Sequence, residues 1–176
     1  MHSIRPANLP DDASAIEAID TSFTTSQVYE ADFGPDGIRL RLKDLDQPVR
    51  KRFPLDDLRT GARPYSDAWV ALTDGSITGF AATSFEAWNR RLVLWHFYVD
   101  GAVRRQGVGR GLIEAVKAHG RERGARHVWL ETSSLNAPGV GVYAALGFSL
   151  TGADLTLYDG TPAEGEVALF YSHRLS

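Results

Sequence analysis

The hydrophobic pattern changes its period within one stretch of this chain, residues 91–124. The apolar run Arg91–Val99 has the composition of a buried strand, and it leads into a short segment rich in glycine and arginine. After that segment Leu112 and Val116 are spaced for one face of a helix, which Gly124 ends. A strand that passes through a glycine loop into a helix predicts an α/β fold.

The rest of the chain extends this pattern on both sides. A helix is predicted to begin at Pro10 and another to cover residues 137–146. Further strands are predicted at residues 2–5, 28–33, 38–43, 67–72, 77–85, 127–130, 148–157 and 167–173. The order is an antiparallel meander followed by a β-α-β-α-β-β unit, which predicts a mixed sheet. Residues 54–66 are rich in Pro, Gly, Asp and Arg, and we expect a mobile loop there.

Length and composition limit what this fold can contain. With 176 residues, and a usual size of roughly 150 residues per domain, we expect a single domain spanning residues 1–176. Hydrophobic residues make up 43% and charged residues 23% of the chain, which excludes a disordered protein. The chain has no cysteine, so a disulfide, a thiol nucleophile and a CxxC zinc site are excluded. We expect no metal site.

The charge balance argues against two classes of partner. Lys and Arg number 19 against 22 Asp and Glu, and this net charge of −3 does not suit a nucleic-acid-binding protein. No stretch approaches 18 uninterrupted apolar residues, and the first residues lack the apolar core of a signal peptide. We therefore expect a cytoplasmic protein with a small-molecule substrate, no nucleic acid and no membrane partner.

The glycine- and arginine-rich segment predicts a phosphate site. Glycines allow a positive φ and leave successive N–H groups bare, and the positive end of the helix dipole lies behind them. Three arginines add positive charge within an acidic protein. The predicted binding residues are Arg104, Arg105, Gln106, Gly107, Val108, Gly109, Arg110 and Gly111. The alternative is a plain strand-to-helix turn with solvated arginines.

Two common phosphate loops fit this segment poorly. A P-loop requires Gly-Lys-Ser/Thr, whereas Arg110 follows Gly109 here. A dinucleotide fingerprint requires a third glycine where this chain has Leu112, and it belongs to a parallel βαβ unit. Glu131 nevertheless lies where the ribose-binding acid of that fingerprint is expected, so a nicotinamide-dependent oxidoreductase stays open as an alternative.

The pattern Arg104-x-x-Gly107-x-Gly109 resembles the acetyl-CoA pyrophosphate loop of the GNAT superfamily of N-acetyltransferases. Downstream, Asn136, Tyr143 and Gly147-Phe148 resemble a second signature of the same superfamily, in the same order. The resemblance implies a mixed, mostly antiparallel sheet that is splayed at its centre and flanked by helices. It also implies acetyl-CoA as co-substrate, with a homodimer as one possible assembly.

Within that superfamily the streptothricin (nourseothricin) acetyltransferases are similar over most of the chain. The shared segments include residues 87–92, 121–125, 129–131 and 157–161, whereas residues 27–66 are the least similar part. This resemblance implies antibiotic resistance through acetylation of the β-lysine amine of streptothricin. Those enzymes carry a Glu-Asp pair where this chain has Trp95-His96, and Tyr98 replaces another acid. A polyamine, an amino acid or a protein amino terminus therefore stays open as the acceptor, as does an inactive CoA-binding module.

The superfamily resemblance also implies roles for residues on the cofactor side. Tyr143 is expected to protonate the CoA sulfur, or else to be a helix aromatic packed on Phe148. Asn136 is expected to hydrogen-bond the pantetheine arm, or else to cap the following helix. The backbone of Phe97, Tyr98 and Val99 would pair with the pantetheine amides as an added strand does.

The general base and the acceptor pocket have several candidates. His96 carries an imidazole, which exchanges protons near neutral pH, and strand alternation would place it on one face with Leu94 and Tyr98. Glu131 is an alternative base or a charge partner for the ammonium group, and water is a third possibility. The acceptor pocket would be lined by Glu86, Trp88 and Asp154, although Trp88 could equally lie at a hairpin corner.

Overall fold

The computed structural model describes residues 2–60 and 63–176, and their contacts divide them into two units. The second unit consists of Ser22–Lys51 and Leu130–His173, and the first unit contains the rest of the described chain. The chain crosses between the two units four times, and each unit is described separately below.

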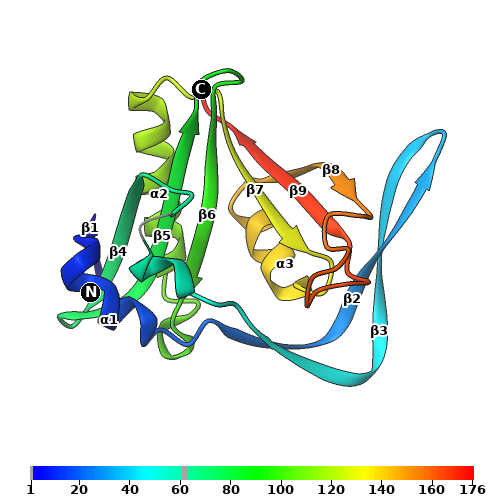
Figure 1. Ribbon diagram of the computed structural model, residues 1–176, viewed down its shortest axis with the longest axis horizontal. Helices are drawn as coiled ribbons and strands as arrows, with labels where there is room; N and C mark the ends of the chain where they lie inside the picture. Colours follow the sequence, from blue (N-terminus) through cyan, green and yellow to red (C-terminus); the bar gives the residue numbers. More distant parts are fainter. Residues whose placement is uncertain (1, 61–62) are drawn as a thin grey trace. The chain divides into compact units, whose positions relative to one another are not determined.

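The elements follow the predicted order closely. The first unit contains β1 (His2–Pro6), α1 (Leu9–Glu17), η1 (Asp56–Arg59), β4 (Asp67–Thr73), β5 (Ser76–Glu86), β6 (Arg91–Val99), η2 (Gly101–Val103), α2 (Val108–Glu122) and the start of β7 (His127–Ser133). The second unit contains β2 (Ser22–Gly34), β3 (Gly37–Arg52), the rest of β7, α3 (Ala137–Ala145), β8 (Ser149–Asp154) and β9 (Ala168–Arg174). The predicted meander and β-α-β-α-β-β unit are both present (Figure 1).

The main sheet is mixed and mostly antiparallel, as predicted. Its strand order is β1-β4-β5-β6-β7-β9-β8. Strands β2 and β3 form a separate two-stranded sheet. The pair β6–β7 is parallel, whereas β1–β4, β4–β5, β5–β6 and β8–β9 are antiparallel. The β6–β7 pairing joins Arg91–Val93 to His127–Trp129 and extends over three residue pairs.

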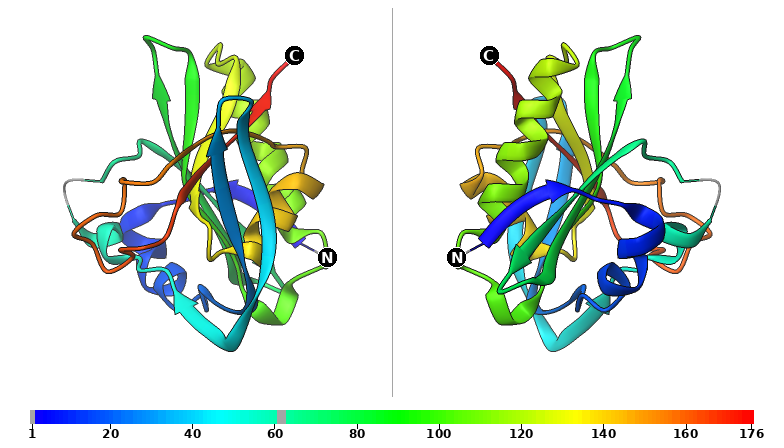
Figure 2. Two further views of the ribbon diagram at one scale, coloured as in Figure 1. Left: turned by 90° about the vertical axis from the view of Figure 1, so that its right-hand side faces the viewer. Right: turned by 90° about the vertical axis from the view of Figure 1, so that its left-hand side faces the viewer.

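Helices cover both faces of the first unit's sheet. Contacts join α2 to β1, β4, β5 and β6, and α1 to β5. Figure 2 shows α1 and α2 on opposite sides of these strands. The apolar side of α2 is fully buried at Leu112, Ile113 and Val116, which is the spacing that predicted the helix.

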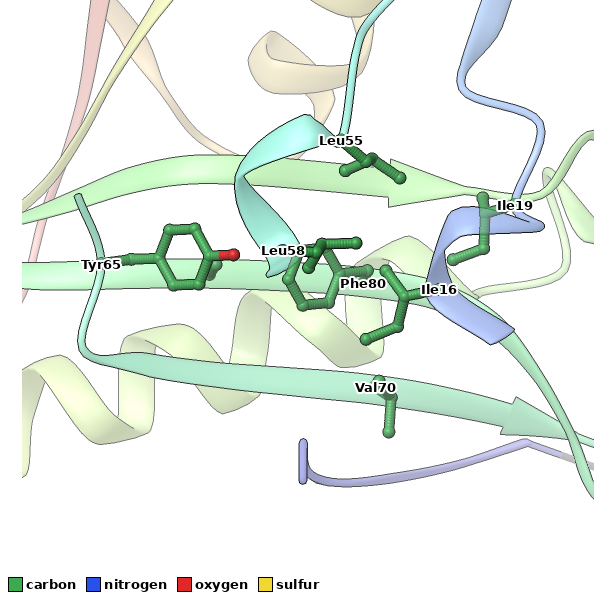
Figure 3. Close-up of a cluster of buried hydrophobic side chains, with 8 residues drawn as sticks. Ile16, Ile19, Leu55, Leu58, Tyr65, Val70 and Phe80 are labelled. Atoms are coloured by element: carbon green, nitrogen blue, oxygen red, sulfur yellow. The ribbon is translucent and has the colours of Figure 1, made fainter. Parts of the chain in front are cut away.

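The segment predicted to be a mobile loop instead belongs to the core of the first unit. Leu55, Leu58 and Tyr65 pack with Ile16 and Phe80 in one buried cluster (Figure 3). A short 3-10 helix, η1, lies in the middle of this segment. The prediction is wrong for these residues because proline, glycine and charged neighbours concealed three buried apolar side chains. Residues 61 and 62 of the predicted loop lie outside the described residues.

A β-bulge changes the side-chain alternation along β6. The β5–β6 register pairs Ala82 with His96 and then Thr83 with Leu94, so Trp95 is an extra residue. Its indole Nε1 donates a hydrogen bond of 2.9 Å to Ser84 Oγ. Because a bulge adds one residue, the residues before and after it no longer follow one alternation.

The glycines of α2 show the consequence of the bulge. A Cβ atom on Gly120 would lie 3.3 Å from Leu92, and one on Gly109 would lie 3.2 Å from Phe97. Leu92 and Phe97 therefore both face α2, although simple alternation would place residues five apart on opposite faces. Leu94 shares the face of Leu92 by alternation, so the prediction that it shares a face with His96 is wrong.

The second unit contains a long β-ribbon. Strands β2 and β3 are joined at the predicted turn but are both longer than predicted, and Figure 2 shows them as two extended strands. The N–H of Tyr29 on β2 donates to the carbonyl of Ser134, the residue after β7, at 3.0 Å. Strand β8 ends at Asp154, earlier than predicted. Among the described residues, no helix is long and apolar enough to cross a membrane.

Candidate active site

The start of α2 presents backbone donors that are not capped by a side chain. Gly107 is the N-cap and has a φ of 88°, a left-handed conformation that glycine adopts without strain. No side chain caps the helix, and Gly107 itself is exposed. The first N–H groups of a helix have no partner within it and face the positive end of its dipole. This terminus therefore suits an anion such as a diphosphate.

The other two glycines of the segment have packing roles. A Cβ on Gly109 would meet Phe97 at 3.2 Å, and one on Gly111 would meet His2 at 3.2 Å and Ile4 at 3.4 Å. The Gly111 N–H already donates to the Gly107 carbonyl at 3.0 Å. The prediction that Gly111 contributes a bare amide is therefore wrong, since that amide closes the first turn of α2. Gly109 and Gly111 allow the helix to approach the sheet.

The remaining residues of the segment differ in how they are held. Arg104 donates from Nε to the Val99 carbonyl at 3.0 Å and from Nη2 to the Asp20 carbonyl at 3.3 Å. It therefore attaches the loop to the end of β6 rather than supplying the mobile charge that we expected. Gln106 Nε2 donates to the Ala102 carbonyl at 3.2 Å. The side chains of Arg105 and Arg110 are exposed, whereas that of Val108 is buried.

The end of β6 pairs with β5. Residues Phe97, Tyr98 and Val99 lie opposite Ala81, Phe80 and Gly79 of that strand. The expected pairing of their backbone with the pantetheine amides stays a prediction.

His96 lies in an aromatic and acidic environment within the first unit. Its Nε2 is 2.8 Å from Asp57 Oδ2 on η1, and its Nδ1 is 3.5 Å from the Tyr98 hydroxyl. The ring packs against Tyr65, Phe80 and Tyr98, with centroid distances of 5.3, 5.8 and 5.7 Å. Burial raises the pKa of Tyr65 to about 12, with a further contribution from the charge of Asp57. The carboxylate engages one ring nitrogen of His96 and leaves the other as the candidate proton acceptor.

Glu86 and Trp88 lie at the other end of the β5–β6 hairpin. Glu86 pairs with Arg91 at the start of β6, and Trp88 is 85% exposed in the turn. Five residues of strand separate Arg91 from His96, which is roughly 16 Å. Figure 1 shows this turn at one end of the hairpin and the loop into α2 at the other. The structure does not bring Glu86 and Trp88 next to His96, and their place in the acceptor pocket stays a prediction.

Tyr143 lies on α3 within the second unit, among other aromatic rings. Its ring is 6.1 Å from that of Phe148 and 6.3 Å from that of Tyr171, so the predicted packing on Phe148 is present. Burial of the hydroxyl, followed by the charge of Glu131, raises the pKa of Tyr143 above its ordinary value. Tyr143 therefore stays protonated throughout the physiological pH range, as a proton donor must before it acts.

Glu131 belongs to a cluster of polar residues in the second unit. It accepts a hydrogen bond from the Tyr158 hydroxyl. Burial raises the pKa of Glu131, and the bond from Tyr158 and the charge of Lys51 oppose that rise. Nearby, Glu166 accepts from Ser133 and pairs with Lys51 Nζ at 2.5 Å. A carboxyl with a raised pKa is more basic than usual and is suited to accepting a proton.

Asn136 has the helix-capping role that the sequence left open. Its Oδ1 accepts from Gly139 N at 3.1 Å, and its Nδ2 donates to Thr132 Oγ1 at 3.0 Å. The residue is buried, with 7% of its surface exposed. The cap and the bond to Thr132 occupy both ends of the side-chain amide, so we do not retain a pantetheine contact for Asn136.

Asp154 stabilises the turn that follows β8. Its Oδ1 accepts from the backbone N–H groups of Thr156 and Leu157 and from the Thr156 hydroxyl, at 2.7 to 3.1 Å. These bonds lower the pKa of Asp154, so it is fully ionised at neutral pH. A turn-forming role accounts for Asp154.

Sequence reasoning missed the partners of two candidate residues. Asp57 was placed in the predicted mobile loop, and Tyr158 was noted only as part of a shared segment. The first is 39 positions from His96 and the second is 27 positions from Glu131. No local pattern relates residues so distant in the sequence. In the part of the chain that the structure describes, no group of three or more His, Asp or Glu could hold a metal ion.

Comparison with known proteins agrees with these features. A model of the acetyltransferase (GNAT) family matches residues 36–148. The chain belongs to the GNAT family of acetyltransferases. The family assignment leaves no basis for the nicotinamide alternative, and the antiparallel strands before the glycine loop agree with that result.

Individual relatives are more specific than the family. The streptothricin acetyltransferase of Streptomyces lavendulae is 44% identical over 170 residues, which cover 93% of this chain and 90% of that protein. The crystal structure of nourseothricin acetyltransferase superposes with a TM-score of 0.88 at 41% identity, over 99% of both chains. A Bacillus anthracis protein solved in complex with acetyl coenzyme A has a TM-score of 0.84 at 24% identity, over 99% of both chains, and shares the fold.

Proposed function

We propose that this protein is an acetyl-CoA-dependent N-acetyltransferase that transfers an acetyl group to the β-lysine amine of streptothricin. The observation that carries this proposal is the 44% identity with a streptothricin acetyltransferase across 93% of the chain. The exposed, uncapped start of α2 supports it, because the geometry suits the diphosphate of coenzyme A. The resulting activity is a form of antibiotic resistance.

The first unit would bind the coenzyme. The N–H groups at the start of α2, beginning at Gly107, would hold the diphosphate, and the exposed Arg105 and Arg110 would add positive charge. The backbone of Phe97, Tyr98 and Val99 would pair with the pantetheine amides. Bound acetyl-CoA supplies the acetyl thioester. Holding thioester and amine in attack geometry contributes roughly 7–11 kcal/mol in well-oriented reactions.

Acid–base residues would supply the remaining catalysis. An amine such as that of lysine has a pKa near 10.4, so it must lose a proton before it attacks. We assign this proton to His96, which has Asp57 on one ring nitrogen. Tyr143 would donate a proton to the departing sulfur, and Glu131 would interact with the substrate ammonium or act as a second base. Such general acid–base steps contribute about 10²–10⁴-fold each.

Three further features belong to this proposal. Residues 1–176 would form one acetyltransferase domain, since the family match at residues 36–148 draws on both units. The enzyme would work in the cytoplasm, where acetyl-CoA is available. A homodimer would cover apolar side chains of the β2–β3 ribbon, such as Phe33 and Leu42, which are 44% and 48% exposed.

A thiol-release assay with acetyl-CoA tests the proposed reaction. The panel would contain streptothricin, a polyamine, free lysine and a peptide with a free amino terminus. We expect the largest kcat/KM with streptothricin, and one acetyl group on its β-lysine by mass spectrometry. A larger kcat/KM with another amine would overturn the substrate, and acetyl-CoA binding without thiol release from any amine would indicate an inactive module.

A further inference from the structure

We propose that Asp57 is a positioning residue that prepares His96 to accept the substrate proton. Asp57 would fix the imidazole in the form that carries its proton on Nε2 and leaves a lone pair on Nδ1. It would also stabilise the imidazolium that forms when Nδ1 takes a proton. This inference rests on the proposed function, since it assigns a partner to the base of the same reaction.

The hydrogen-bond geometry determines the tautomer. An ionised carboxylate accepts hydrogen bonds but donates none. Asp57 Oδ2 lies 2.8 Å from His96 Nε2, so that nitrogen must carry the proton. In the neutral ring Nδ1 is then the acceptor, and it lies 3.5 Å from the Tyr98 hydroxyl. A buried carboxylate on one ring nitrogen is the general way to orient an imidazole that acts as a base through the other.

The surroundings of the ring make a countercharge necessary. His96 has a side-chain exposure of 12% and packs against the rings of Tyr65, Phe80 and Tyr98. A positive charge in such a place is costly unless it is paired and hydrogen-bonded. The carboxylate of Asp57, itself 26% exposed, is the group that the structure places against the ring nitrogen. Protonation of His96 therefore depends on Asp57.

The position of Asp57 is fixed by its neighbours on η1. Leu58, the next residue, is 3% exposed in the core, and its N–H donates to the Leu55 carbonyl at 3.2 Å. Arg59 holds the carboxylate of Glu17 on α1 through two nitrogens, at 2.6 and 2.8 Å. Because η1 is held by a buried side chain and by a two-point ion pair, Asp57 has little freedom to leave His96.

The proton transfer balances without any further reactant. The substrate ammonium loses one proton to Nδ1, which gives a neutral amine and an imidazolium whose Nε2–H stays bonded to Asp57. The amine nitrogen then forms a bond to the acetyl carbon while the carbon–sulfur bond breaks. Tyr143 gives its proton to the sulfur, which leaves as a thiol, and the second proton of the nitrogen restores the Tyr143 hydroxyl. The imidazolium finally returns its proton to water.

Asp57→Asn tests the proposal because it keeps the shape of the side chain and removes its charge. We expect kcat for streptothricin acetylation to fall about 100-fold or more, with KM for acetyl-CoA unchanged. Asp56→Asn removes the same charge from an exposed neighbour on η1 and is the matched control. In the double variant His96→Ala/Asp57→Asn, we expect kcat to equal that of His96→Ala alone, because a positioning residue acts only through its base. The proposal would be overturned if the losses in kcat of the two single variants multiplied in the double variant. An unchanged kcat in Asp57→Asn would also overturn it.

A pH profile separates positioning from a purely structural role. The titratable and charged groups that face His96 are Asp57 on η1, Tyr98 on β6 and Tyr65, over whose ring Arg63 lies at 5.9 Å. Removing the carboxylate charge disfavours the imidazolium, so the acidic limb of kcat against pH should move to lower pH in Asp57→Asn. An unmoved acidic limb would contradict the proposal, even if kcat had fallen.

Nitrogen NMR gives a readout that does not depend on activity. Long-range ¹⁵N–¹H spectra distinguish the two neutral tautomers of histidine, and the signal of His96 would be assigned by its loss in His96→Gln. We expect the Nε2–H tautomer in the wild type and a mixture in Asp57→Asn, and an Nδ1–H tautomer in the wild type would overturn the proposal. If the wild type does not acetylate streptothricin, the proposed function fails. If it does and Asp57→Asn is fully active, only this inference fails.

Discussion

Helices α2 and α3 of this protein begin in opposite ways. Helix α2 starts at Gly107 in a left-handed conformation, without a side-chain cap. Helix α3 starts at Asn136, whose side chain accepts from Gly139 N and is itself held by Thr132. In α3 the protein satisfies its own amides, whereas in α2 it leaves them to an external acceptor.

The difference indicates how each helix would contribute to function. An uncapped start gives up stability that a Ser, Thr, Asp or Asn cap would provide, typically about 1 kcal/mol. Such a start is useful where a ligand satisfies the amides, so we infer that α2 contributes through its main chain. The start of α3 is capped by Asn136, so this helix would contribute through a side chain, the hydroxyl of Tyr143. Four substitutions test this contrast.

Tyr143→Phe has the largest expected effect, because it removes the function assigned to α3. The ring contacts with Phe148 and Tyr171 remain, whereas the proton donor is lost. We expect kcat to fall by about 10²–10⁴-fold with little change in acetyl-CoA affinity. Steady-state kinetics and calorimetric titration measure the two quantities. Tyr171→Phe removes the neighbouring hydroxyl and should retain most of the activity, so equal losses in both variants would contradict the assignment to Tyr143.

Gly107→Val has the next largest effect and tests the main chain of α2. A β-branched residue at a φ of 88° is strained by about 1–3 kcal/mol. If the loop relaxes to avoid that strain, acetyl-CoA binding must force it back into the strained conformation. The energy of that change lowers the affinity for acetyl-CoA by roughly 5- to 150-fold. Calorimetric titration of the folded variant measures this change.

The control for Gly107→Val is Gly101→Ala in the same connection. A Cβ on Gly101 meets nothing within 4 Å, and its φ is not in the left-handed region. This variant should bind acetyl-CoA as the wild type does. Full affinity in Gly107→Val would show that α2 does not hold the diphosphate through its first turn.

Asn136→Ala should affect stability rather than binding, if the start of α3 serves only the fold. Loss of the cap should lower the free energy of unfolding by about 1 kcal/mol. The melting temperature should then fall by roughly 2–4 °C for a chain of this size. Thermal denaturation checks this value. A large fall in acetyl-CoA affinity with unchanged stability would instead restore the pantetheine contact and remove the contrast between the two helices.

Glu131→Gln has the smallest expected effect and examines the surroundings of Tyr143. Burial raises the pKa of Glu131 in the folded state, so its contribution to stability is fully present below the unfolded pKa and is lost as pH rises through the folded one. Glutamine stays neutral and can still accept from Tyr158. The melting temperature of the variant relative to the wild type should therefore increase between pH 4 and pH 8, by roughly 1–4 °C. A constant difference across that range would indicate that Glu131 is not penalised by burial.

Much of the fold could be predicted because the informative signals are local. The apolar face of α2, the glycines that follow both helices and the alternating strands are each visible within about ten residues. The segment 54–66 could not be predicted, since Leu55, Leu58 and Tyr65 are separated by polar, proline and glycine residues and are buried only through Ile16 and Phe80. The bulge at Trp95 was also hidden, because an extra residue in a strand has no marker in the strand itself.

The residues of the candidate site likewise divide into those that the sequence could predict and those that it could not. The Gly107 loop and the position of Tyr143 were recognisable because a backbone conformation or a motif spacing specifies them. The different roles of Gly107, Gly109 and Gly111 were not, since the second and third glycines are needed for an approach to Phe97 and Ile4 from other strands. The distance of Glu86 and Trp88 from His96 was also hidden, because residues close in sequence can lie far apart along an extended hairpin.

The amino-acid sequence alone therefore determined the class of fold, the family and the loop at the start of α2. Each depends on residues that are neighbours along the chain, and local conformational preferences act at that range. Only the tertiary structure decided that Asp57 meets His96, that Tyr158 meets Glu131 and that Asn136 uses its amide within the fold. Hydrogen bonds between distant residues depend on how the elements pack, and packing is set by many side chains acting together.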